Sequence, residues 1–258
     1  MTPVAHAAMQ DTPSSACRLT APTHAGRVRE AYIALHEEFS RWTPSDAFRH
    51  TFRASVVEEL QRRSNSQGRI SVLEVGCGHG TWALEMYEQV PRADERIEYL
   101  GIDFTEPRIE LGRVRMAEHT SASFLVADCE QFQPRQRFDV ILGIEVISHV
   151  ERRKYRQWLE RWFSWLAPGG TVIIIDKDRF TKHALRLSWD VFKRRWLPRS
   201  MTARPYYFPE HFGDYAETIY YPSFASLRRM AIRMGYTARP LVEHRFFRAM
   251  FLDRPTEA

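Results

Sequence analysis

The hydrophobic positions of this chain form short continuous runs, separated by longer stretches of helical spacing. Five runs have the length and apolar character of strands buried on both faces of a sheet. They are residues 72–75, 97–103, 123–128, 138–143 and 171–176. Because a segment of roughly helix length follows each of the first four runs, the pattern predicts an alternating β/α chain with a parallel sheet.

Further elements are predicted on both sides of these runs. Residues 28–64 have the spacing of two helices, and residues 223–236 predict a helix that starts at a serine and ends near a glycine. Residues 246–252 supply a final strand, and Ala167–Gly170 is expected to form a turn before the fifth strand. The chain therefore continues well beyond the five parallel strands.

Three glycines at alternate positions follow the first strand. Gly76, Gly78 and Gly80 come after Glu74, and helical spacing resumes directly behind them. Glycine is needed where the backbone turns with positive φ, or where a ligand approaches too closely for a Cβ. The loop indicates a nucleotide-cofactor site, although a tight strand-to-helix turn gives the same local pattern.

Acidic residues end the second and third strands. Asp103 lies 23 residues after Gly80, where a carboxylate can accept both hydroxyls of a ribose, and Asp128 follows the third strand. Nicotinamide-binding Rossmann proteins are the nearest alternative, but their third glycine comes three residues after the second. Here that spacing is two, and both extra acids, Glu74 and Asp128, depart from the dehydrogenase pattern.

Over about residues 55–252 this ordered set resembles the class I S-adenosylmethionine-dependent methyltransferases, small-molecule branch. The elements that carry the resemblance are Glu74–Gly80, Asp103, Asp128, Phe138–Val150 and Leu166–Gly170. The resemblance implies an α/β fold: a Rossmann-like, seven-stranded, mostly parallel sheet with helices on both faces and an antiparallel last strand. It also implies S-adenosylmethionine as cofactor and a helical, aromatic lid insertion.

The resemblance assigns roles around the cofactor. Gly76 and Gly78 would approach its amino-acid head, Gly80 would allow helix packing, and Glu74 would lie beneath the loop. Asp103 would hold the ribose diol. The other implied cofactor contacts, several of them around the adenine, are Cys77, Phe104, Asp128, Cys129, Ile144 and Glu145.

Methyl transfer depends mainly on positioning, and a base is needed only if the acceptor arrives protonated. His149 is the candidate base, because imidazole titrates near neutral pH and the resemblance makes this position face the methyl group. A hydrogen bond from His149 to a neighbouring loop is the alternative. The expected acceptor-binding residues are Tyr32, His149, Tyr206, Tyr207 and Tyr220.

A metal is not expected. Asp176 and Asp178 follow the fifth strand and have the oxygen ligands that magnesium or calcium prefers. Metal-dependent members of the family also carry an acid at the end of the fourth strand. Gly143 and Ile144 occupy that place here, so we expect a site without metal.

The segment 177–222 is expected to form the lid and to select the acceptor. Residues 177–204 hold nine basic and two acidic side chains, and eight aromatic residues fall within 206–224. This composition favours an acidic or planar small molecule, although the rings can also pin the lid to the sheet. Two alternatives are a basic helix on a membrane surface or partner, and an RNA-binding surface.

Length and composition set the remaining expectations. At 258 residues and 44% apolar, the chain forms one domain, residues 27–258, preceded by a mobile arm, residues 1–26, without the pattern of a secretory signal. No apolar run approaches the length of a membrane span. Three scattered cysteines suit a reducing cytoplasm, and a monomer or homodimer is expected.

The sequence thus predicts methyl transfer to an oxygen or nitrogen of a small acidic, planar or aromatic acceptor, in secondary or specialised metabolism. The alternatives are an RNA or protein methyltransferase, or an inactive cofactor-binding subunit that uses the basic helix as an interaction surface.

Overall fold

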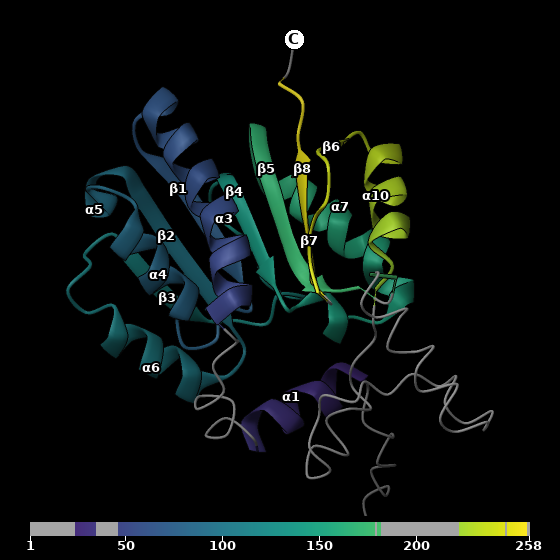
Figure 1. The fold of residues 1–258 in the computed structure, drawn as a ribbon. Helices are drawn as coiled ribbons and strands as arrows, with labels where there is room; N and C mark the ends of the chain where they lie inside the picture. Colours follow the sequence, from purple (N-terminus) through teal and green to yellow (C-terminus); the bar gives the residue numbers. More distant parts are fainter. Residues whose placement is uncertain (1–23, 35–45, 179, 182–221, 246, 257–258) are drawn as a thin grey trace, which may run out of the picture.

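A single mixed sheet forms the centre of the molecule (Figure 1). The computed structural model describes residues 24–34, 46–178, 180–181, 222–245 and 247–256. The strands are β1 Ile70–Val75, β2 Ile97–Asp103, β3 Ala122–Val126, β4 Phe138–Ile144, β5 Leu166–Lys177, β6 Thr237–Ala238, β7 Val242–His244 and β8 Phe247–Asp253. Their order in the sheet is β3-β2-β1-β4-β5-β8-β6, with β7 also paired to β8.

The sheet has the predicted parallel and antiparallel parts. β1 to β5 pair in parallel, whereas β8 runs antiparallel to β5. β6 and β7 pair with successive stretches of β8, and they therefore share one strand position at the edge. The sheet is seven positions wide, and the prediction of a Rossmann-like, seven-stranded sheet with an antiparallel last strand is confirmed.

Helices cover both faces of the sheet (Figure 1). α3 and α4 bury their apolar side chains on one face together with part of α6, while α7 and α10 cover the other. The helical elements are α1 His24–Ala34, α3 Asp46–Gln67, α4 Thr81–Gln89, α5 Ala93–Arg96, α6 Glu106–Arg115, α7 Tyr155–Trp165 and α10 Phe224–Arg233, with short 3₁₀ turns η1 Ile147–His149 and η2 Arg152–Lys154. Within the described ranges, none of these helices has both the length and the apolar character that a membrane crossing needs.

α1 differs from the other helices because it lies across the carboxyl ends of the parallel strands (Figure 1). β4 and β5 both point toward it. In a parallel sheet this edge is the one at which the loops that bind ligands meet. The fold therefore places a helix from the start of the chain over the predicted site.

Several predicted boundaries hold and others do not. Ser223 precedes α10 as its N-cap, and its hydroxyl accepts from the amide of Ser226. The turn expected at Ala167–Gly170 is wrong, because β5 begins at Leu166 and runs through it. Leu166 pairs with Phe138, and the register shifts before Thr171 pairs with Val140. The glycines therefore allow a bulge inside the strand.

The other differences concern chain segments near their ends. β3 ends at Val126, two residues earlier than predicted, which leaves Asp128 in the following loop. α1 begins at His24, within the last residues of the predicted arm. Residues 1–23 lie outside the described ranges, as does most of the predicted lid, residues 182–221, so both remain predictions.

Candidate active site

The glycine loop between β1 and α4 forms the floor of the site. Gly76, Gly78 and Gly80 all have positive φ, at 68°, 54° and 71°. A Cβ on Gly76 would lie 2.6 Å from Cγ2 of Val146, and a Cβ on Gly80 would lie 2.9 Å from the ring of Phe124. Both the backbone conformation and the space therefore require glycine here.

Asp103, at the end of β2, holds this loop in place. Its Oδ2 accepts from the amide of Gly78 at 3.0 Å, and its Oδ1 accepts from the amide of Thr105 at 2.8 Å. The side chain is 7% exposed. Because each carboxylate oxygen has two lone pairs, Asp103 can still accept from the two hydroxyls of a ribose.

Glu74 lies on β1, two residues before the first glycine of the loop. It is buried, and the hydroxyl of Tyr99 donates to its Oε2 at 2.6 Å. Burial raises the pKa of Glu74 to about 8, and the negative charges of Asp103 and Glu85 act in the same direction. The carboxyl group is therefore mostly protonated at neutral pH when no cation is nearby.

Cys77 fills the space between the loop and β2. A Cβ on Gly101 would lie 2.8 Å from the Cys77 sulfur, and the thiol is buried. Burial raises the pKa of this thiol well above its usual value. Cys77 is therefore a packed, protonated side chain rather than a nucleophile.

The segment after β4 adopts an unusual conformation. Ile144 is buried, and Glu145 follows it with φ of 55°. The Glu145 carboxylate pairs with the ammonium of Lys177 at 2.6 Å. Asp176 is fully buried and accepts from the amide of Ser148 at 2.8 Å, and burial raises its pKa to about 6. These contacts fix the turn that carries His149.

Tyr32 and His149 meet at the carboxyl edge of the sheet. The Tyr32 hydroxyl lies 2.9 Å from Nε2 of His149, although the two residues are 117 positions apart. The Tyr32 ring also makes edge-to-face contacts with His149 and with Phe104, at centroid distances of 5.2 and 6.0 Å. α1 thus brings three residues predicted for the site into one cluster.

Arg108 belongs to the same cluster but was not predicted. Its guanidinium carbon lies 5.4 Å from the centroid of the Tyr32 ring. A Cβ on Gly78 would lie 2.8 Å from its Nη2, so Arg108 covers the loop directly. The sequence feature that could have identified Arg108 is its position in the first turn of α6, the helix that follows Asp103.

The remaining predicted residues make other contacts or lie outside the described ranges. Asp128 accepts from the amide of Glu130 at 2.8 Å, and within the described ranges no hydrogen bond joins it to the glycine loop. The carbonyl of Cys129 accepts from Arg161, and burial raises the pKa of its thiol to about 12. The side chains of Tyr206, Tyr207 and Tyr220 lie outside the residues that the structure describes.

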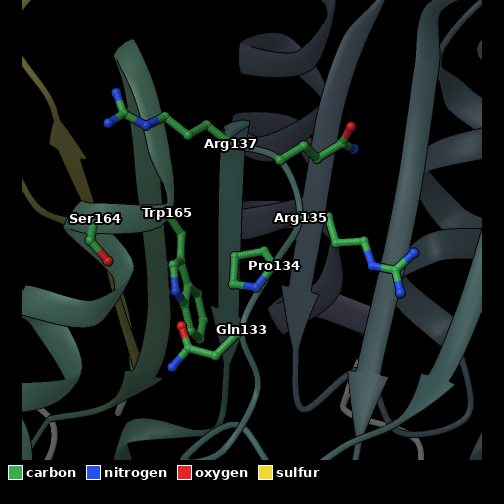
Figure 2. Close-up of a pocket in the computed structure, with 7 residues that line it drawn as sticks. Gln133, Pro134, Arg135, Arg137, Ser164 and Trp165 are labelled. Carbon is green, nitrogen blue, oxygen red and sulfur yellow. The ribbon is translucent and has the colours of Figure 1, made fainter.

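A separate pocket of about 420 Å³ lies near the opposite, amino end of β4 (Figure 2). Trp165 stands beside Pro134 there, while the guanidinium groups of Arg135 and Arg137 point away from each other. This pocket shares no residue with the glycine loop. Elsewhere in the described part of the chain, no group of three or more His, Cys, Asp or Glu residues is placed to hold a metal ion.

Comparison with known proteins agrees with this geometry. Residues 72–170 match the family described as a methyltransferase domain. The ubiquinone biosynthesis O-methyltransferase of Bradyrhizobium diazoefficiens is 29% identical over 144 residues, which cover 55% of this chain and 54% of that protein. Nodulation protein S of Sinorhizobium fredii is 31% identical over 144 residues, covering 55% and 64% of the two chains.

The solved structures show the same fold. The magnesium protoporphyrin IX methyltransferase of Synechocystis PCC 6803 with bound SAM superposes with a TM-score of 0.59 at 15% identity, covering 91% of this chain and 98% of that one. At this identity the likeness concerns the fold alone. The chain spans about half the length of the ubiquinone methyltransferase that it matches.

Proposed function

Since the chain belongs to the class I S-adenosylmethionine-dependent methyltransferases, we propose that it transfers a methyl group to an oxygen or nitrogen of a small molecule. The observation that carries this proposal is the Tyr32–His149 pair beside the glycine loop. It adds a titratable group and an aromatic wall to a cofactor cradle. One relative named above is an O-methyltransferase, which supports an oxygen acceptor.

The described residues fit the cofactor. The three glycines allow the positive φ angles of the loop, and Asp103 retains acceptor capacity for a ribose. Asp103 would therefore hold the diol, and the amides of the loop would face the amino-acid part. When bound, the cofactor supplies an electrophilic methyl group on a positively charged sulfur.

His149 is the proposed proton acceptor. Its Nε2 already takes part in a hydrogen bond with the Tyr32 hydroxyl, which marks the place of an acceptor hydroxyl or amine. An acceptor group at this place would transfer its proton to Nε2 as its oxygen or nitrogen becomes nucleophilic. Asp176, through the amide of Ser148, positions the turn that carries the imidazole.

The surroundings support an acidic, planar or aromatic acceptor. Tyr32 and Phe104 present ring edges and faces, and Arg108 adds a positive charge beside them. We also propose that residues 177–222 set the acceptor specificity and that the reaction belongs to specialised metabolism. A location in a reducing cytoplasm is proposed as well, and the free thiols of Cys77 and Cys129 support it.

The test is calorimetric titration of S-adenosylmethionine and S-adenosylhomocysteine into the wild type and two variants. Asp103→Ala should lose at least tenfold in affinity, about 1.4 kcal/mol. Glu98→Ala, which removes an exposed carboxylate from the other end of β2, should bind as the wild type does. Binding would justify a screen of acceptors with labelled methyl groups, and absence of binding to the wild type would overturn the proposal.

A further inference from the structure

Arg108 lies between the glycine loop and α1, at the centre of the candidate site. It is half-buried on the first turn of α6. One side of its guanidinium group faces the Tyr32 ring, and its Nη2 covers Gly78. The group therefore lies on the backbone that we expect to receive the amino-acid part of the cofactor.

No carboxylate balances this charge in the part of the chain that the structure describes. The side chain of Arg108 makes no hydrogen bond or ion pair there, and its Nε is buried without a partner. Arg113, on the same helix, differs: it pairs with Glu110 and donates to the carbonyl of Phe124. The contact with the Tyr32 ring compensates Arg108 only in part.

A buried guanidinium nitrogen without an acceptor is unfavourable unless a ligand supplies one. The planar group of arginine matches a carboxylate, which accepts two parallel hydrogen bonds from it. We propose that Arg108 is a specificity-determining residue that binds a carboxylate group above Gly78. This inference rests on the proposed function and adds the anionic group that the site recognises.

Two molecules could bring this carboxylate: the amino-acid head of the cofactor, or an acidic acceptor. The position over Gly78 favours the cofactor, because this glycine belongs to the loop expected to bind the head. The two sources can be separated with three probes. S-adenosylhomocysteine carries the carboxylate, 5′-methylthioadenosine lacks the amino-acid head, and 4-hydroxybenzoate represents an aromatic acid.

The experiment compares Arg108→Met with the wild type, with Arg108→Lys and with Arg137→Met as a control. Arg137 is an exposed arginine beside the distant pocket, so its loss changes the net charge equally. Each protein is titrated with S-adenosylhomocysteine and with 5′-methylthioadenosine. 4-Hydroxybenzoate is then titrated into protein saturated with S-adenosylhomocysteine. Thermal unfolding checks that each variant folds. If Arg108→Met does not fold, the comparison is made with Arg108→Lys.

If Arg108 binds the carboxylate of the cofactor, Arg108→Met should lower the affinity for S-adenosylhomocysteine at least tenfold. The affinity for 5′-methylthioadenosine should change less than twofold. Arg108→Lys should retain part of the affinity, because it keeps the charge and loses the planar fork. If Arg108 instead binds the carboxylate of an acidic acceptor, Arg108→Met should bind S-adenosylhomocysteine with unchanged affinity. Its affinity for 4-hydroxybenzoate should fall at least tenfold.

Three results would overturn the inference. The first is unchanged or tighter binding of every probe to Arg108→Met, which would mean that the side chain merely covers the empty loop. The second is an equal loss for both adenosine ligands, and the third is an equal loss in Arg137→Met. Failure of the wild type to bind S-adenosylhomocysteine would instead contradict the proposed function, so the two failures are distinguishable.

Discussion

Buried charges gather at both ends of the parallel strands, but their partners differ. At the amino edge, Glu59 of α3 accepts from Arg63 at 2.6 Å and from Arg239 at 2.7 and 3.0 Å. Arg239 also pairs with Asp253 of β8 at 2.7 Å, and Thr171 joins the same cluster. Glu59 and Arg63 are only 3% and 4% exposed, yet both have counter-ions.

The carboxyl edge has ion pairs as well, such as Glu145–Lys177, but it also has groups that cost the folded chain free energy. Arg108 has no counter-ion among the described residues, Glu145 has a left-handed backbone, and Glu74 has a pKa raised by burial. Each of these is unfavourable to the folded chain alone. The cluster at the amino edge joins α3 to the last strands through paired charges. At the carboxyl edge Glu145 pairs with Lys177 and Glu74 accepts from Tyr99, whereas the guanidinium group of Arg108 has no counter-ion among the described residues.

The largest expected effect is the loss of one partner from the amino-edge cluster. Glu59→Ala leaves Arg63 buried without its carboxylate, and we expect a loss of about 3 kcal/mol in the free energy of unfolding. Denaturant unfolding measures it, and Glu58→Ala, an exposed neighbour on α3, is the control. The arginine hydrogen bonds hold the Glu59 pKa at about 2. The stability contribution of Glu59 should therefore be present above pH 4.5 and be lost as the pH falls toward 2.

A second expected effect concerns Glu74 and has the opposite sign. Its pKa is about 8 in the folded chain, so the unfolded chain ionises first, and stability should fall as the pH rises from about 4.5 to 8. Glu74→Gln keeps an acceptor for the Tyr99 hydroxyl and removes this titration. We expect a flatter profile and a gain on the order of 2 kcal/mol near pH 8. The prediction would be contradicted if Glu74→Gln kept the wild-type slope of stability against pH and Glu98→Gln lost it.

A third prediction separates backbone strain from close approach at the glycine loop. Gly76→Ala places a Cβ against Val146 and should lower the affinity for S-adenosylhomocysteine at least tenfold, about 1.4 kcal/mol. Gly235→Ala has φ of 94° with nothing within 4 Å of the new carbon, so it carries similar strain in open space. Calorimetry should find normal affinity in Gly235→Ala. Equal losses in both variants would indicate general strain instead.

The smallest expected effect concerns the Tyr32 hydroxyl. Tyr32→Phe removes one part-buried hydrogen bond to His149, worth about 1 kcal/mol, or roughly a fivefold change in turnover. Because the bond reaches the imidazole, the pH profile of turnover should also shift. Tyr87→Phe loses a hydroxyl bonded to Ser121 and should leave both unchanged. If the pH profile of turnover is not shifted in Tyr32→Phe, Tyr32 has no role in the candidate site.

Continuous apolar runs made the sheet predictable, because strands buried on both faces leave a strong local pattern. The bulge in β5 was missed because Gly169 and Gly170 look like a turn in sequence, and only the pairing with β4 reveals the strand. Asp103 could be placed from its spacing. Arg108 could not, because its contacts depend on where α1 lies, and Tyr32 is 117 residues away from His149.

The position of α1 has a consequence for how such a site can diverge. The residues that would hold the cofactor lie on the sheet and its loops, whereas the cover over them comes from a helix that ends before the matched domain starts at residue 72. The two are encoded separately. Changes in α1 can therefore alter which acceptor fits while the glycine loop and Asp103 stay unchanged.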